Sequence, residues 1–280
     1  MKNIISENKT IGIIGFGHLG HSLVLPLLKN GLPKEKLMIS YKGSKATEQK
    51  IEELGLTQCT VQSETLMQHA DIVIIATRPQ DVLTLPFSAL GSNALVVSCM
   101  AGLPVDLLES LFGRAYRIMC SGPDTILEGN GVATMFPFDA RVTQLLDFMD
   151  LEFLPSSSEE ELDSFTVGIC IPPILLNIEV PEEEIQSGLL HMEKKYPIYA
   201  PLRQWIQKVM PQHHDIQADG CLERVSTKGG ISEAMTRALR NGLPFTDALE
   251  TGMERGREIT GDIRRNVETF TQREGTQSGE

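Results

Sequence analysis

Short apolar runs alternate with amphipathic segments along the first half of the chain. Apolar, β-branched runs predict strands at 11–14, 36–40, 71–77, 94–100, 116–120, 131–137 and 151–155. Helical periodicity predicts a helix that ends at Asn30 and others at 45–55, 85–91, 105–113 and 140–150. Strands that alternate with helices at this spacing predict an α/β fold with a parallel sheet covered on both faces.

The pattern changes after residue 155. The stretch SSSEEELDSF is polar and acidic, and it is typical of a helix start with a serine cap and glutamates in the first turn. From there the periodicity is helical, without a convincing strand or an internal repeat. We therefore expect two domains, residues 1–157 as an α/β domain and residues 158–280 as an all-α domain.

Composition excludes several classes of function. The chain of 280 residues has a formal net charge of −12, and its basic residues are scattered, which argues against a nucleic-acid or anionic-membrane surface. Its apolar runs are shorter than the roughly 20 residues that span a bilayer, and its first residues lack the apolar core of a signal peptide. Five cysteines without paired spacing argue against a disulfide framework or a metal site. We expect a cytoplasmic protein with no metal.

A glycine motif follows the first predicted strand and opens the first predicted helix. In G-x-G-x-x-G, the first glycine permits the turn, the second lets the backbone approach a pyrophosphate, and the third lets helix and strand pack closely. The alternative is a tight strand-to-helix turn without a ligand. The residues that we expect to hold a dinucleotide here are Gly15, Phe16, Gly17, His18, Leu19 and Gly20.

The end of the second predicted strand distinguishes the two nicotinamide cofactors. An acidic residue there would accept a hydrogen bond from the ribose 2′-hydroxyl and repel a 2′-phosphate. This chain reads MISYKGSK instead, so that Ser40 and Lys42, with Lys45 nearby, are available to a phosphate. We expect NADPH as the cofactor; the alternative is that these lysines only solvate a loop.

A second glycine pair, Gly229–Gly230, precedes a helix-forming run in the second half of the chain. Paired glycines allow a nest of free amides, and the positive end of a helix favours an anion. A side chain at Gly230 is expected to crowd the anion and to disfavour the backbone conformation. The alternative is that the glycines only permit close helix packing.

Five segments together resemble the pyrroline-5-carboxylate reductase family over most of the chain: IGIIGFGHLG, ADIVIIATRPQDV, LVVSCMAGLPVDLLESLFG, RIMCSGPDTILEGNGVA and LERVSTKGGISEAM. The resemblance implies a Rossmann-type NADPH-binding domain and an all-α domain that forms an interlocked homodimer or a higher homo-oligomer. It implies reduction of a small cyclic imine to an amino acid, by default pyrroline-5-carboxylate to L-proline. Further cofactor contacts implied by the resemblance are Ala76, Thr77, Arg78, Pro79, Ala101 and Met119.

The segment STKGGIS is similar to the S-P-G-G-T-T loop of that family, which holds the substrate carboxylate. The resemblance implies a substrate site made by Lys228, Gly229, Gly230, Ile231 and Ser232. Ser232 is the candidate proton relay to the imine nitrogen, and Thr227 is the second catalytic candidate.

One segment departs from the family pattern. ICIPPIL stands where the family has S-G-S-G-P-A-Y, so small polar residues have become bulky apolar ones. Three hypotheses follow: reduction of pyrroline-5-carboxylate, reduction of a different and bulkier imine, or an NADP(H)-binding dimer without turnover that serves as a regulatory or interaction protein.

Overall fold

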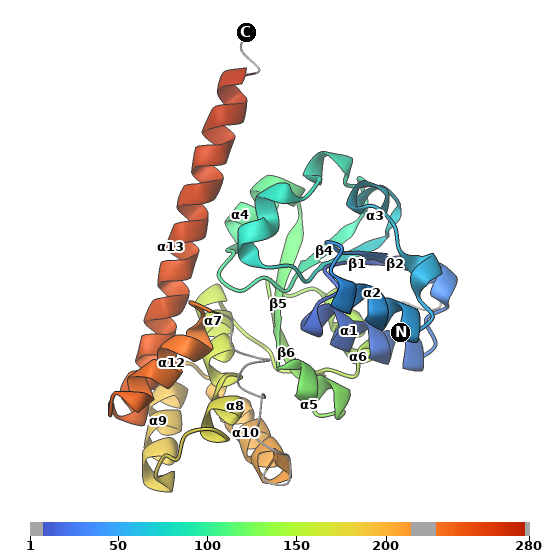
Figure 1. Ribbon diagram of the computed structural model, residues 1–280. Coiled ribbons are helices and arrows are strands. Elements are labelled where there is room, and N and C mark those ends of the chain that lie inside the picture. Colours follow the sequence, from blue (N-terminus) through green and yellow to red (C-terminus); the bar gives the residue numbers. More distant parts are fainter. Residues whose placement is uncertain (1–7, 214–227, 278–280) are drawn as a thin grey trace.

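The computed structural model describes residues 8–213 and 228–277. Its centre is a seven-stranded sheet in the order β2-β1-β3-β4-β5-β6-β7 (Figure 1). The strands are β1 (Ile11–Ile14), β2 (Leu37–Ser40), β3 (Ile72–Ile75), β4 (Leu95–Ser98), β5 (Ala115–Cys120), β6 (Val132–Phe136) and β7 (Glu152–Phe153). Strands β1 to β5 run parallel, as the alternating pattern predicts.

Helices cover both faces of this sheet. One core joins the sheet to α1, α2 and α6, and another joins its opposite face to α3 and α4. The helices of this part are α1 (His18–Lys29), α2 (Lys45–Glu53), α3 (Ser63–His69), α4 (Val105–Phe112), α5 (Pro123–Leu127) and α6 (Ala140–Phe148), with 3-10 turns η2 (Lys34–Lys36), η3 (Thr57–Cys59), η4 (Pro79–Thr84) and η5 (Phe87–Ala89). The predicted α/β fold with a Rossmann-type N-terminal part is confirmed.

The sheet differs from the prediction in one respect, because β6 runs antiparallel to β5. Residues 121–131, with the short helix α5, are too few for the crossover that a parallel neighbour needs. The helix predicted at 85–91 is only the 3-10 turn η5, while α3, α5 and η4 are elements that the apolar pattern did not predict.

After β7 the described residues form helices only. They are α7 (Glu159–Gly168), α8 (Ile171–Leu175), α9 (Glu182–Lys195), α10 (Tyr199–His213), α12 (Ile231–Arg240) and α13 (Phe245–Gln277), and they enclose a core of their own. The predicted serine cap is confirmed, since the Ser158 hydroxyl accepts a hydrogen bond from the Glu161 amide at 3.1 Å. The boundary between two independent domains at residue 157 stays a prediction.

Several contacts hold the helical part against the α/β part, and two of them involve paired charges. Helix α13 lies along the α/β part (Figure 1), where Ile263 and Val267 enter its core and Arg264 forms a bidentate ion pair with Asp106.

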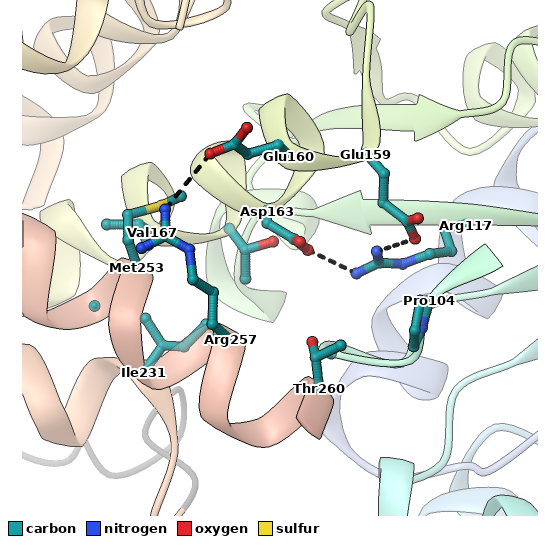
Figure 2. Close-up of a pocket in the computed structure, with 14 residues that line it drawn as sticks. Pro104, Arg117, Glu159, Glu160, Asp163, Val167, Ile231, Met253, Arg257 and Thr260 are labelled. Atoms are coloured by element: carbon teal, nitrogen blue, oxygen red, sulfur yellow. Dashed lines mark hydrogen bonds and ion pairs between the residues drawn. The ribbon is translucent and has the colours of Figure 1, made fainter. Parts of the chain in front are cut away.

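The second contact is a buried guanidinium. Figure 2 shows Arg117 of β5 between Glu159 and Asp163 of α7, at the edge of a cavity of about 250 Å³. The Arg117 side chain is 2% exposed, and its Nε lacks a partner among the described residues. A cation in the middle of an apolar strand is tolerated here because α7 presents two carboxylates one turn apart. Across the described residues, no helix has the length and apolar character needed to cross a membrane.

Candidate active site

A cavity of about 660 Å³ lies between the sheet and the helical part. His18, Leu19, Pro79 and Gln80 line it from the ends of the first strands, and residues 228–232 line it from the start of α12. In parallel sheets of this type, ligands bind outside the carboxyl ends of the strands. The two glycine segments, more than two hundred residues apart in the chain, thus border one cavity.

The first glycine turn has the geometry that its motif predicts. Gly15 has a φ of +98°, and a Cβ on Gly20 would lie 2.0 Å from the Gly15 carbonyl oxygen. By contrast, a Cβ on Gly17 would meet nothing within 4 Å. Gly17 is the N-cap residue of α1, no side chain caps this helix, and its first turn has no acidic residue. Open space in front of uncapped amides fits a pyrophosphate.

Ser40 and Lys42 already have partners. The Ser40 side chain is buried, and its hydroxyl lies 2.7 Å from the Ser63 hydroxyl, so it is directed into the protein. Lys42 Nζ lies 2.7 Å from Asp81 Oδ1. A phosphate at the end of β2 would therefore have to compete with Asp81 for the charge of Lys42.

The remaining predicted cofactor residues fall into two groups. Ala101 and Met119 line the cavity with His18, Leu19 and Pro79. The side chain of Phe16 is buried in the core, and Thr77 directs its hydroxyl to Met100 Sδ at 3.7 Å. The predicted cofactor residues that are not among those lining the cavity are Gly15, Phe16, Gly17, Gly20, Ser40, Lys42, Ala76, Thr77 and Arg78.

The second glycine turn is only partly open. Gly229 has a φ of +73°, its carbonyl accepts a hydrogen bond from Arg255 Nε at 2.7 Å, and its amide donates to the Glu233 carboxylate. Free amides at both glycines were expected, and that expectation is wrong for Gly229. Gly230 has a φ of −89°, which any residue can adopt, so the predicted backbone strain belongs to Gly229 instead.

Ser232 is 5% exposed and lines the cavity. Its hydroxyl donates to Cys170 Sγ at 3.1 Å, and that thiol donates to the Thr166 carbonyl at 3.2 Å. Burial raises the pKa of the Cys170 thiol to about 11, so it stays protonated at neutral pH. Thr227, the other catalytic candidate, lies outside the described residues.

An apolar wall completes the cavity on the side of the helical part. It consists of Ile169, Cys170, Pro172, Pro173, Leu176 and Trp205. The first five belong to the segment that departs from the family pattern or follow it directly, and the Trp205 indole is held by a 2.7 Å hydrogen bond to the Asn130 carbonyl.

Sequence reasoning missed one side of the cavity, which α13 supplies. Its lining residues are Arg255, Ile259, Asp262, Ile263, Arg265 and Asn266. They recur at intervals of three and four, which places them on one face of a helix. That periodicity was a usable signal, but the sequence does not reveal that this face turns toward the distant glycine turn of β1.

The fold and this cavity define a class, the NAD(P)-dependent oxidoreductases with a Rossmann domain. Residues 10–102 match the family described as NADP oxidoreductase coenzyme F420-dependent. The chain is 28% identical over 263 residues to pyrroline-5-carboxylate reductase of Haemophilus influenzae, covering 89% of this chain and 95% of that protein. It is 24% identical over 255 residues to pyrroline-5-carboxylate reductase 2 of Bacillus subtilis, covering 86% and 90%.

Solved structures agree in fold. A pyrroline-5-carboxylate reductase from Coxiella burnetii superposes with a TM-score of 0.59 at 19% identity, covering 90% of this chain and 98% of that one. A Plasmodium falciparum pyrroline carboxylate reductase with NADP bound gives a TM-score of 0.56 at 18% identity, covering 91% and 99%. Together with the motifs, these comparisons support a similarity to the pyrroline-5-carboxylate reductases that extends over most of the chain.

Proposed function

We propose that the chain reduces a small cyclic imine that bears a carboxylate, with NADPH as the hydride donor and pyrroline-5-carboxylate as the default substrate. One observation carries this proposal: a single cavity is bordered by the dinucleotide-type glycine turn and by the Gly229–Gly230 turn at the start of α12. Imine reduction asks mainly that cofactor and substrate be held face to face.

Two features of the chain would bind the phosphates of a dinucleotide. The uncapped amides at the start of α1 would hold the pyrophosphate, with Gly17 leaving the approach open. Lys42 would hold the 2′-phosphate after release from Asp81. When bound, NADPH supplies the hydride for the imine carbon.

The substrate carboxylate would bind at the start of α12. Gly230, Ile231 and Ser232 precede the first repeating hydrogen bonds of this helix, in which the Ala234 amide bonds to the Gly230 carbonyl. Lys228 and Arg255 line the same end of the cavity and add positive charge. Gly229 would contribute the conformation of the turn and not a free amide, because its carbonyl accepts from Arg255 and its amide donates to Glu233.

Ser232 would donate a proton to the imine nitrogen. Its hydroxyl must first turn from Cys170 Sγ toward the cavity, and a water in the cavity would restore the proton. Because Cys170 is neutral near pH 7, breaking this hydrogen bond separates no charges.

The apolar wall favours a second candidate, a reductase of a bulkier imine. Small substrates would leave Ile169, Pro173 and Leu176 uncovered, whereas an alkyl or aryl substituent would pack against them.

An NADPH-oxidation assay tests these candidates. It compares pyrroline-5-carboxylate with cyclic imines that carry alkyl or aryl groups, and with imines that lack the carboxylate. Faster reduction of pyrroline-5-carboxylate than of any other imine supports the default substrate, and faster reduction of a substituted imine supports the second candidate. NADPH binding without reduction of any imine contradicts both and supports a dimer without turnover.

A further inference from the structure

An ion pair bridges the two strands that flank β1. Lys42 follows β2, and Asp81 lies in η4 after β3. Since β1 lies between β2 and β3 in the sheet, the pair joins the loops on either side of the glycine turn. Lys42 Nζ and Asp81 Oδ1 lie 2.7 Å apart, and their side chains are 68% and 34% exposed.

This arrangement supplies an acid that the sequence at the end of β2 lacks. NADH-binding Rossmann domains carry an acidic residue at the end of the second strand. In this chain the residues there are Ser40, Tyr41 and Lys42, and a carboxylate from η4 contacts the ammonium group of Lys42.

The carboxylate is the less mobile partner of the pair. Val82 within η4 and Leu85 directly after it are 2% and 7% exposed and belong to a hydrophobic core, and α13 packs against η4. Pro79 and Gln80, just before Asp81, line the cavity. The Lys42 side chain is long and exposed. When the ion pair breaks, we therefore expect the lysine to move and Asp81 to stay beside the cavity.

We propose that Asp81 is a specificity-determining residue for the cofactor, because its carboxylate competes with the 2′-phosphate of NADPH for Lys42. NADH has no phosphate at this position and does not need Lys42. Asp81 thereby reduces the preference for NADPH over NADH. This inference rests on the proposed function only in that the dinucleotide binds at the β1 glycine turn.

The test is calorimetric titration of the full chain with NADPH and with NADH, in the wild type and in Asp81→Asn. Asparagine keeps the size of the side chain and removes its charge. We expect the Kd for NADPH to fall about three- to tenfold and the Kd for NADH to change less than about twofold. High salt should narrow the difference in NADPH affinity between the wild type and Asp81→Asn, since both charged side chains are accessible to solvent.

Lys42→Gln shows whether Asp81 acts through the lysine. In that background Asp81→Asn should change the NADPH affinity by less than about twofold, because no cation remains to be released. An effect as large as in the wild type overturns the proposal.

A matched control is available in the pair Lys29–Asp150, with 3.2 Å between its charged atoms and side chains 74% and 37% exposed. Asp150→Asn should leave both affinities unchanged. If Asp81→Asn leaves the NADPH-to-NADH ratio unchanged while both dinucleotides bind, the role of Asp81 is refuted and the proposed function stands. If the wild type binds neither dinucleotide, the proposed function fails as well.

Discussion

Gly17 and Gly20 belong to one motif, but they meet different surroundings. A methyl group on Gly20 would lie 2.0 Å from the Gly15 carbonyl oxygen, whereas one on Gly17 would project into open space. Gly20 thus serves the packing of α1 on β1, and Gly17 serves the approach of a ligand.

Alanine substitutions should separate these roles. Gly20→Ala should destabilise the protein by about 1–3 kcal/mol through overpacking. Gly17→Ala should keep the wild-type free energy of unfolding and weaken NADPH binding at least about tenfold, because the methyl group fills the phosphate approach. Denaturant titration and calorimetry measure the two quantities. Equal losses of stability in both variants would contradict this division.

Ser232 and Gly230 allow a second comparison at the substrate end. Ser232→Ala should lower kcat about tenfold or more if the hydroxyl relays the proton, with an unchanged Kd for NADPH. Gly230→Val should abolish substrate binding by crowding the anion, again with NADPH affinity retained. Initial rates and calorimetry with NADPH measure both effects. Full activity in Gly230→Val would exclude the α12 turn as the carboxylate site.

Arg117 is a buried charge whose removal should destabilise the fold. Arg117→Met would leave Glu159 and Asp163 without their cation. Because these carboxylates are 29% and 38% exposed, we expect a loss of about 1–3 kcal/mol, less than the ~3–5 kcal/mol of a fully buried pair. Arg114→Met is the control, since that side chain is 75% exposed and should cost less than about 0.5 kcal/mol. Denaturant unfolding of both variants is the measurement.

At the scale of elements, the start of α6 carries the clearest pH dependence. Hydrogen bonds from Arg141, and also from Tyr116, hold the pKa of Asp139 well below its ordinary value of 3.8. Because the folded state binds this proton less readily, ionised Asp139 stabilises the fold above pH 3.8, and this contribution is lost as the pH falls below it.

Asp139→Asn should therefore flatten the fall of the unfolding free energy below about pH 4. Arg141→Gln should have a similar effect, since it removes the principal cause of the pKa shift. Denaturant unfolding across the acid range compares the slopes. A slope in Asp139→Asn as steep as in the wild type would contradict the assignment.

Elements with strong local signals were predictable from the sequence, and elements fixed by tertiary contacts were not. Strand β1 and the Ser158 cap of α7 follow from β-branched runs and capping chemistry. The direction of β6 depends on the length of its connection, and α5 in that connection has no periodicity to reveal it. Likewise Lys42 was visible as a cation, but its pairing with Asp81 depends on β2 and β3 flanking β1.

At the scale of the whole molecule, the helical half is the predicted dimer interface. Among its described residues, Leu190 and Leu243 are large apolar side chains that are exposed, at 44% and 43%. We expect a homodimer or a higher homo-oligomer in light scattering. Leu190→Asp and Leu243→Asp should shift it toward monomer, while Leu127→Asp, 47% exposed beside the sheet, should not. A monodisperse wild-type monomer at micromolar concentration would refute the interface.

Trp205 gives the cavity an optical property of its own. It is the chain's single tryptophan, it is 4% exposed, and its indole is fixed to the Asn130 carbonyl at the apolar wall. Tryptophan emission excited at long wavelength therefore originates at one point of the cavity lining. A substrate bound against the wall would change the polarity around this fluorophore. A bound reduced nicotinamide would quench the indole emission by energy transfer, because it absorbs at the wavelengths where indole emits. A shift of the emission wavelength would thus report a ligand at the apolar wall, and a loss of emission intensity would report the reduced cofactor, without any label attached to the protein.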